Sequence, residues 1–131
     1  MEWQQDLSVG DTALDNDHRA IFKLIDKVQS AAESGLDSTL IEIALDRLVG
    51  YANGHFAREE EFMRRMRYPH IERHRAQHRA MVDHLRVLQS RFDQDDENIG
   101  EDLVVFLNDW WYVHILQEDM AYKRFAEKKR A

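Results

Sequence analysis

Apolar side chains recur every three or four residues along most of this chain, which is the spacing of one face of an α-helix. The pattern predicts four amphipathic helices, at about residues 16–34, 38–65, 69–92 and from residue 99 onward. Asp15 and Asn16 are suitable caps for the start of the first helix, and Gly35 is a suitable stop. Four such helices with short links predict an all-α, up-down-up-down four-helix bundle.

The two ends of the chain and one connection complete this prediction. Residues 1–14 contain scattered apolar side chains and predict an N-terminal arm along the outside of the bundle. Residues 93–98 predict a solvated acidic loop, and the basic residues 120–131 predict a short C-terminal helix. Such a basic run either ends a solvated helix or docks against an acidic partner or a membrane surface. We expect one domain over residues 1–131, because a chain of this length builds one hydrophobic core but hardly two.

The composition excludes several classes of protein. The formal net charge of −7 argues against nucleic acid as the main partner. The absence of cysteine excludes disulfides, thiolate zinc sites, iron–sulfur clusters and cysteine nucleophiles. The N-terminus lacks a signal-peptide pattern and no apolar run reaches the length of a membrane span, so we expect a cytoplasmic protein. Nothing in the sequence demands more than a monomer.

Polar side chains occupy several core positions of the predicted helices. His74 and His78 lie four residues apart, which places them one turn apart on the same helix face. In an up-down-up-down bundle, all the core positions that carry polar side chains fall at the same end of the molecule. These positions are His18, His55, Glu59, His74, His78 and His114. His70 and His84 fall outside the core positions, and we expect them on the surface.

Five imidazoles and a carboxylate buried in one region indicate a metal site, because buried polar groups need partners. Imidazole and carboxylate ligands suit iron, zinc or copper rather than magnesium or calcium. Five imidazoles are too many for one tetrahedral zinc ion and suit two metal ions bridged by carboxylates. Glu59 can be one bridge, and the fourth helix offers Glu118 or Asp119 for the second. Helical spacing from His114 favours Glu118, whereas Asp119 faces inward only if the helix bends or tightens there.

At this point the sequence resembles the hemerythrin family, and its single-domain bacterial members in particular. The resemblance covers nearly the whole chain and includes an N-terminal arm with Trp3 and Leu7-Ser8-Val9-Gly10. The other matching segments are Asp15-Asn16-Asp17-His18, His55-Phe56-Ala57-Arg58-Glu59-Glu60, Pro69 ahead of His74-Arg75-Ala76-Gln77-His78, and His114 followed by Asp119. One departure is that Asn16 and Asp17 precede His18, where the family often has other polar residues.

The resemblance implies two non-haem iron ions bridged by Glu59, Asp119 and an oxo or hydroxo group. His74, His78 and His114 would bind one iron, and His18 and His55 would bind the other and leave it an open position. The resemblance therefore favours Asp119 over Glu118. The implied function is reversible binding of dioxygen, for transport, storage or delivery to an oxygen-consuming enzyme. The oxygen pocket should be apolar and dry, with a lining of Ile21, Phe56, Trp110 and Leu116.

Other functions fit the same residues less well. A ferritin-type di-iron oxidase would use Glu-x-x-His motifs, and no histidine here follows a glutamate by three residues. An oxygen or redox sensor module is usually fused to an output domain, which this sequence lacks. An enzyme acting on peroxide or nitric oxide is harder to exclude, because the same open iron could support it. A purely structural bundle would bury clustered imidazoles and a carboxylate at a large cost. We therefore expect an oxygen-binding protein rather than an enzyme.

Overall fold

The computed structural model describes residues 3–33, 38–93 and 99–130, and these residues form helices and short connections with no strand among them. A short 3₁₀ turn, η1 (Gln5–Leu7), precedes the long helices α1 (Thr12–Glu33), α2 (Ser38–Arg65) and α3 (Ile71–Asp93). The last long helix is built of α4 (Ile99–Val105), η2 (Phe106–Trp111), α5 (Tyr112–His114), η3 (Ile115–Asp119) and α6 (Met120–Arg130). The predicted stop at Gly35 and the predicted acidic loop after Asp93 lie outside the described residues.

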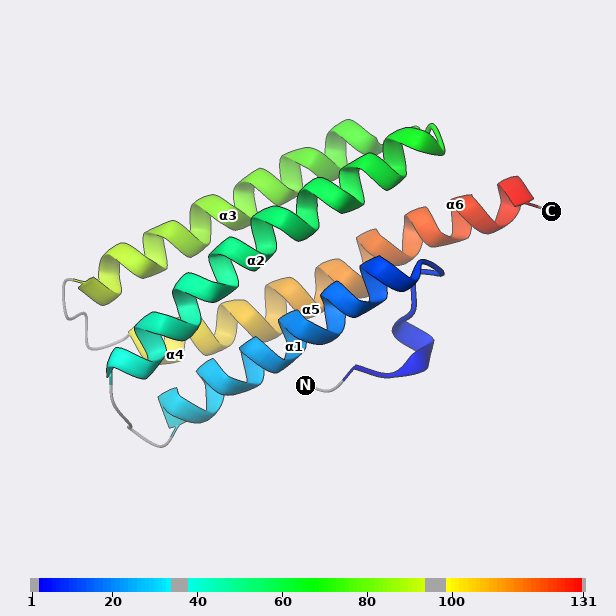
Figure 1. Cartoon of the computed structure of the whole chain (residues 1–131). Helices are drawn as coiled ribbons and strands as arrows, with labels where there is room; N and C mark the ends of the chain where they lie inside the picture. The colour runs from blue at the N-terminus through cyan, green and yellow to red at the C-terminus, as the bar shows by residue number, and fades with distance from the viewer. Residues whose placement is uncertain (1–2, 34–37, 94–98, 131) are drawn as a thin grey trace.

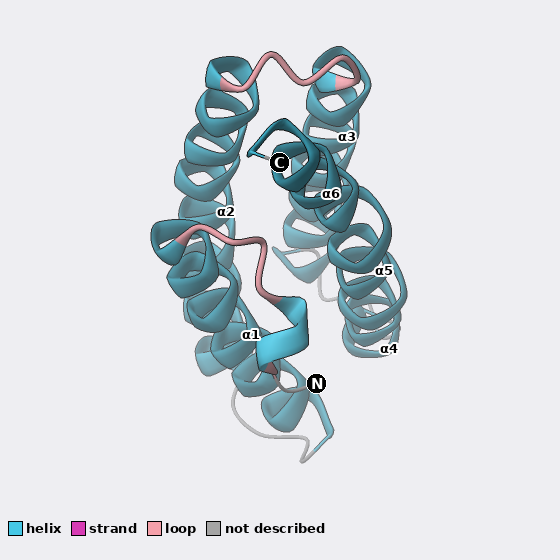
Figure 2. Cartoon of the chain, turned by 90° about the vertical axis from the view of Figure 1, so that its right-hand side faces the viewer, coloured by secondary structure: helices cyan, strands magenta, loops and turns pink. Residues whose placement is uncertain are grey.

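The long helices run alternately up and down and pack side by side, so the predicted all-α bundle is confirmed (Figure 1). Seen towards its end, the bundle places α1 and α2 on one side and α3 and the last helix on the other (Figure 2). The ends of α2 and α6 and the starts of α1 and α3 lie at the same end of the molecule (Figure 1). This arrangement brings the histidine-bearing parts of all four helices to one level.

Helix α1 begins four residues earlier than the predicted start at Asn16. The carboxylate of Asp11 accepts a hydrogen bond from the backbone N–H of Leu14 at 3.0 Å, as an N-cap residue does. Gly10 precedes it with a φ of +84°, a conformation that glycine adopts without strain. Asp15, which we expected to cap the helix, instead accepts hydrogen bonds from Ser8 Oγ at 2.5 Å and Val9 N at 2.9 Å. Asp15 therefore fastens the N-terminal arm to α1.

The predicted short C-terminal helix is present as α6, and it follows the rest of the last helix without a break, so that this helix is continuous from Ile99 to Arg130. Residues 120–130 continue the fourth helix as α6. Two segments of this helix, η2 and η3, are π-helical. A π-helical turn takes up one residue more than an α-helical turn, so the side chains beyond it fall on different faces from those that an unbroken α-helix predicts.

The buried apolar side chains form two clusters, one on each side of a polar layer. On α1, for example, Leu14 of the small cluster precedes His18, and Ile21 of the large cluster follows it. The large cluster includes Ile21, Phe56, Met81 and Trp111, and the small one is Val9, Leu14, Met63, Tyr68 and Tyr122. The polar layer is therefore enclosed by hydrophobic side chains both above and below. Among the described residues, no helix is long and apolar enough to cross a membrane.

Candidate metal centre

Seven polar side chains from all four long helices converge in the layer between the two apolar clusters. Each is at most 5% exposed, which is rare for histidine, aspartate and glutamate. They are His18 from α1, His55 and Glu59 from α2, His74 and His78 from α3, His114 from α5, and Asp119 from η3. These are the seven residues that the sequence singled out. The two other histidines that the sequence placed outside the core, His70 and His84, are exposed.

The seven residues form two overlapping groups that share both carboxylates. One group consists of His18, His55, Glu59 and Asp119, and the other of His74, His78, His114 and the same two carboxylates. Within each group, one ligand atom of every residue lies within 4.8 Å of the others, which is close enough to surround a metal ion. The split into two and three histidines matches the one that the resemblance implied.

The oxygen atoms of the shared carboxylates divide between the two groups. Glu59 Oε2 lies 3.1 Å from His55 Nε2, whereas Glu59 Oε1 lies 2.8 Å from His74 Nε2 and 2.9 Å from His78 Nε2. Asp119 Oδ2 lies 3.2 Å from His18 Nε2, whereas its Oδ1 lies 3.0 Å from His74 Nε2 and 3.2 Å from His114 Nε2. Each carboxylate thus presents one oxygen to each group, which is the arrangement of a bridging ligand.

The π-helical segment η3 explains why Asp119 rather than Glu118 faces the cluster. Five residues separate His114 from Asp119, and a π-helical turn brings residues at this spacing onto the same face. Asp119 is 1% exposed. Glu118 points outward and pairs with Arg73 of α3 at 3.0 Å. The helix widens here, whereas the sequence suggested that a bend or a tighter turn would be needed.

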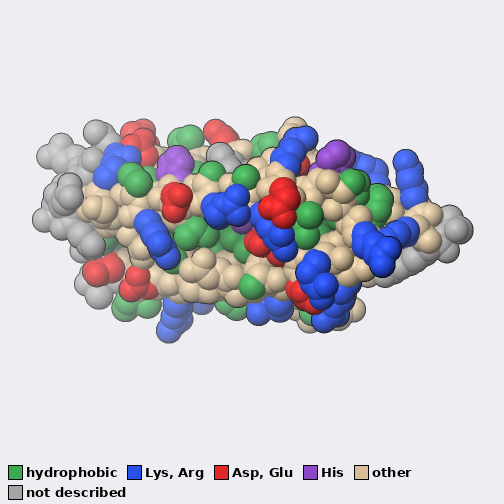
Figure 3. Space-filling view, turned by 90° about the horizontal axis from the view of Figure 1, so that it is seen from above, with side chains coloured by type: hydrophobic (Ala, Val, Ile, Leu, Met, Phe, Trp, Pro, Cys, Tyr) green, Lys and Arg blue, Asp and Glu red, His purple; other side chains and the backbone are tan. Residues whose placement is uncertain are grey.

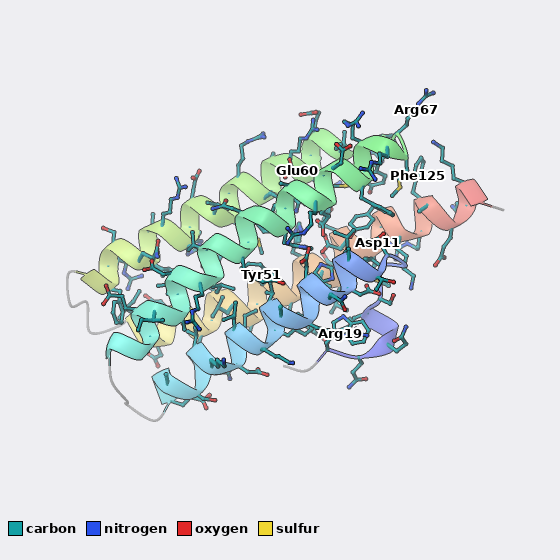
Figure 4. All side chains as sticks on the ribbon, viewed as in Figure 1. Asp11, Arg19, Tyr51, Glu60, Arg67 and Phe125 are labelled. Atoms are coloured by element: carbon teal, nitrogen blue, oxygen red, sulfur yellow. The ribbon has the colours of Figure 1, made fainter. Side chains whose placement is uncertain are left out.

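Two carboxylates outside the cluster hold the outer nitrogens of its histidines. His55 Nδ1 lies 3.0 Å from Asp17 Oδ2, and Arg58 binds both oxygens of Asp17 at 2.7 and 2.8 Å. His78 Nδ1 lies 2.8 Å from Glu60 Oε2, and Arg75 lies 3.3 Å from the other oxygen of Glu60. Such carboxylate–histidine pairs fix the tautomer and the orientation of a metal-binding imidazole. Glu60 lies between α2 and α3 (Figure 4).

The sequence analysis did not assign these orienting carboxylates, although signals for both were present. Asp17 was noted only as a departure from the family pattern, and Glu60 only as part of a matching segment. Asp17 directly precedes the candidate ligand His18, and Glu60 directly follows the candidate ligand Glu59. Their partners are 38 and 18 residues away along the chain, so only the fold brings each pair together.

Tyr122 was also missed, and it contacts the cluster directly. Its hydroxyl donates a hydrogen bond to Glu59 Oε2 at 3.2 Å, and its ring centroid lies 5.8 Å from that of His74. The side chain is completely buried. Burial and the nearby Glu59 carboxylate raise the pKa of Tyr122 well above 10, so the phenol remains a hydrogen-bond donor. It covers the cluster on the side of the small apolar cluster.

The charges within the cluster stabilise one another. Burial lowers the pKa of His18, but the carboxylates of Asp119 and Glu59 outweigh it and raise that pKa to about 10. Burial likewise opposes the charge of His74, and the same two carboxylates raise its pKa to about 10. Burial raises the pKa of Asp17, yet hydrogen bonds from His55 and Arg58 lower it to about 2. Ionised carboxylates are thus buried deep in the bundle, and the neighbouring imidazoles are close enough to form ion pairs with them.

The four residues predicted to line the oxygen pocket are not all buried beside the cluster. Ile21 and Phe56 are buried, and the Phe56 ring stacks on His78 with centroids 3.9 Å apart. Leu116 is 40% exposed, which contradicts its predicted place in the lining. The Trp110 side chain lies outside the described residues. Its neighbour Trp111, which the sequence did not select, is 1% exposed and lies 5.8 Å from the Phe56 ring.

Two different causes account for these positions. Trp110 was expected inward from ordinary helical spacing, but in the π-helical segment η2 it is Trp111, five residues after the buried Phe106, that shares the inward face. Leu116 was selected only because it lies close to a candidate ligand in sequence. It follows His114 by two residues, which places it on the opposite face of the helix.

The cluster has the donor set and the unmet bonding capacity that a metal site requires. Imidazole nitrogens and carboxylate oxygens are ligands suited to iron, and five of the seven donors are imidazoles. Nε2 of His18 lies within 3.5 Å of both shared carboxylates, yet among the described residues it forms no hydrogen bond with acceptable geometry. Buried polar atoms in this condition are uncommon and need an explanation. A cation between the nitrogen and the carboxylates would satisfy all of them.

Comparisons with known proteins agree with this geometry. Residues 9–126 match the family model described as the hemerythrin HHE cation binding domain. A protein named bacteriohemerythrin from Stenotrophomonas maltophilia is 31% identical over 120 residues, which cover 92% of this chain and 77% of that protein. A bacteriohemerythrin from Methylococcus capsulatus is 31% identical, with 82% of each chain covered, and one from Campylobacter jejuni is 27% identical, with 94% and 92% covered. With the bundle and the buried cluster, these similarities show that the chain belongs to the hemerythrin family.

Proposed function

We propose that this protein binds dioxygen reversibly at a centre of two non-haem iron ions. In this proposal His74, His78 and His114 hold one iron, and His18 and His55 hold the other. Glu59 and Asp119 bridge the two ions together with a solvent-derived oxo or hydroxo group. The observation that carries the proposal is the division of the carboxylate oxygens, in which each of the two carboxylates offers one oxygen to each group of histidines.

The unequal number of histidines supports a binding role. Three histidines on one side and two on the other would leave one ion with a free position at which a small molecule can bind. A pair of ferrous ions would supply the electrons that hold dioxygen and would recover them on its release.

The side chains around the cluster keep water out of it. Phe56 covers His78 on the side of the large apolar cluster, and Trp111 packs behind Phe56. Tyr122 closes the opposite side while its hydroxyl holds Glu59 in place. An apolar enclosure of this kind keeps out the water and acid that would promote irreversible oxidation of the ferrous ions by oxygen.

We infer a role in carrying, storing or delivering oxygen rather than in catalysis. Among the described residues, the buried side chains nearest the cluster that are not candidate ligands are mainly aliphatic and aromatic. They offer few groups that could activate a second substrate. An oxygen-consuming enzyme would be the partner in delivery.

The test is an oxygen cycle on the iron-loaded protein. The protein is reduced without air, its absorption spectrum is recorded, and oxygen is then admitted and removed several times. We expect about two irons per chain and a colour that appears with oxygen and disappears when oxygen is removed. A single bound zinc, or iron that oxidises at once and never releases oxygen, would refute the proposal.

Two histidine variants provide a matched comparison in this test. His55→Ala removes a candidate ligand and should abolish the reversible colour, because the histidine is buried in the cluster. His70→Ala removes an exposed histidine and should behave like the unchanged protein.

A further inference from the structure

Four basic side chains form a surface at the end of the bundle where α2 turns into α3 and where α6 ends. Lysine and arginine side chains gather towards this end (Figure 3). We call this surface the basic end, and it consists of Arg67, Arg124, Lys128 and Lys129, all of which are exposed. It contrasts with the chain as a whole, whose formal net charge is −7.

Among the described residues, no acidic side chain pairs with the basic end, whereas the surrounding basic residues have such partners. Arg64 and Arg65 pair with Glu61, and Arg73 pairs with Glu118. In the part of the chain that the structure describes, no ion pair involves any residue of the basic end. Lys129 donates a hydrogen bond to the carbonyl oxygen of Met66 at 2.5 Å, which leaves its positive charge uncompensated.

Arg67 occupies a position where the backbone favours glycine. Its φ is +56°, and it is the only non-glycine residue with a positive φ among those described. Tyr68 N binds Met63 O at 3.0 Å and Arg67 N binds Arg64 O at 3.1 Å, a pair of bonds that ends helices with glycine at this position. A side chain here strains the fold. The arginine points away from the bundle (Figure 4), so this strain is not offset by packing.

The basic end lies next to the candidate metal centre. The bond from Lys129 to Met66 joins α6 to the turn after α2. Tyr68, the residue after Arg67, has its ring 5.4 Å from that of Phe125 and 6.5 Å from that of Tyr122. Since Tyr122 touches Glu59, only two aromatic side chains separate the basic end from the cluster. The backbone that carries the four cations is therefore packed against the end of the bundle that encloses the centre.

We propose that the basic end docks the acidic surface of a partner protein. A group of exposed cations suits a partner surface rich in carboxylates, because charge complementarity steers and orients such encounters. A membrane fits less well, because none of the large exposed hydrophobic side chains found in the described residues lies in segments 61–75 or 120–130. The docking surface lies outside the metal cluster and does not depend on the proposed oxygen chemistry.

The test compares Arg67→Gly with the unchanged full chain in two measurements. The first is the denaturant midpoint, which should rise because glycine adopts the positive φ without strain. The second is the affinity for poly-L-glutamate at low salt, measured by calorimetry. This affinity should weaken roughly two- to fivefold. Arg124→Ser and Lys128→Ser should weaken binding to a similar extent. Arg47→Ser removes an exposed charge from the other half of α2 and should change nothing.

The outcomes separate the possible occupants. Binding that falls with salt and with each basic-end variant, while Arg67→Gly is more stable, would support a docking site kept at the expense of stability. Equal weakening by Arg47→Ser would overturn the proposal, because only the overall charge would then matter. Tighter binding to vesicles containing phosphatidylglycerol, or to a DNA duplex, would also overturn it and assign the surface to a membrane or a nucleic acid. A lower denaturant midpoint for Arg67→Gly would show that Arg67 stabilises the fold, and it would overturn the proposal that the arginine is kept for docking.

Discussion

Single side chains outside the cluster determine how its histidines present their nitrogens. Asp17 holds His55, and Arg58 holds Asp17 through two hydrogen bonds. The pair is well protected, since Asp17 is 6% exposed. An imidazole fixed in this way would need no reorientation to bind a metal, so the free energy of metal binding would depend in part on a residue that is not itself a candidate ligand.

Asp17→Asn should therefore weaken metal binding without removing any ligand. An amide can still accept from His55, but it carries no charge to support the metal-bound imidazole. We expect metal affinity to fall by roughly 10- to 100-fold, measured by competition with a chelator of known affinity. Asp6→Asn, at an exposed position in η1, is the control and should leave the affinity unchanged. Equal affinities for the two variants would exclude the orienting role of Asp17.

The adjacent acids Glu118 and Asp119 provide a second comparison at the residue scale. Asp119→Asn removes a shared carboxylate and should reduce the iron content to one ion or none. Glu118→Gln removes an ion pair with Arg73, whose side chain is 66% exposed, and should change the free energy of unfolding by less than about 0.5 kcal/mol. Iron analysis and denaturant unfolding of both variants test this. Loss of iron in Glu118→Gln alone would mean that Glu118, rather than Asp119, is the shared carboxylate.

The seven residues of the cluster could be found from the sequence because they break the apolar pattern at core positions. Six were evident from spacing alone, and Asp119 required the family resemblance. Asp17, Glu60 and Tyr122 could not be assigned in this way, because their partners are distant in the chain. Periodicity predicts which face a side chain occupies, but not which side chain on another helix it will meet.

At the scale of helices, the two π-helical segments set the register of the fourth helix. They turn Trp111 and Asp119 inward. No composition signal distinguishes η2 or η3 from ordinary helix, so the sequence predicted the existence of the fourth helix but not its register. The bounds of α2 were predicted correctly because its apolar face is long and regular. The start of α1 was missed because Asp11 and Asp15 are both suitable caps, and the arm uses Asp15.

Deletion of Gln117 tests the role of η3. The residue is exposed, and its removal would place Asp119 four residues after His114, the spacing of an ordinary α-helix. We therefore expect this variant to fold and to retain its metal. Deletion of the exposed Asp83 within α3 is the control and should unfold the protein, because it rotates Leu85 and Leu88 out of the core. Metal loss after deletion of Gln117 would show that the wider turn itself is required.

At the scale of the whole molecule, a charged layer lies between two apolar clusters. The bundle topology was predictable, because four amphipathic helices with short links leave few alternatives. The gathering of uncompensated basic side chains at one end was not, because Arg67 and Lys128 are 61 positions apart in the sequence. Only the closed bundle shows that the basic end and the cluster are neighbours.

The metal-free protein should become less stable as the pH rises above neutrality. The pKa values of His18 and His74 are raised from 6.5 to about 10 in the folded chain. A raised pKa contributes stability that is fully present below pH 6.5 and is lost as pH rises through about 10. The metal-free protein should thus lose stability between these values, and metal loading, which displaces the protons, should release them to solvent. Denaturant unfolding across this range and proton release on loading measure both effects, and a flat profile with no release would contradict the account.

Diffraction from crystals of the iron-loaded protein, recorded at the iron absorption edge, would decide whether one buried cluster holds two iron ions. We expect two anomalous peaks in the polar layer. One peak should be bound by His74, His78 and His114, the other by His18 and His55, and both by Glu59 and Asp119. A single peak, or two peaks that do not share these carboxylates, would contradict this expectation.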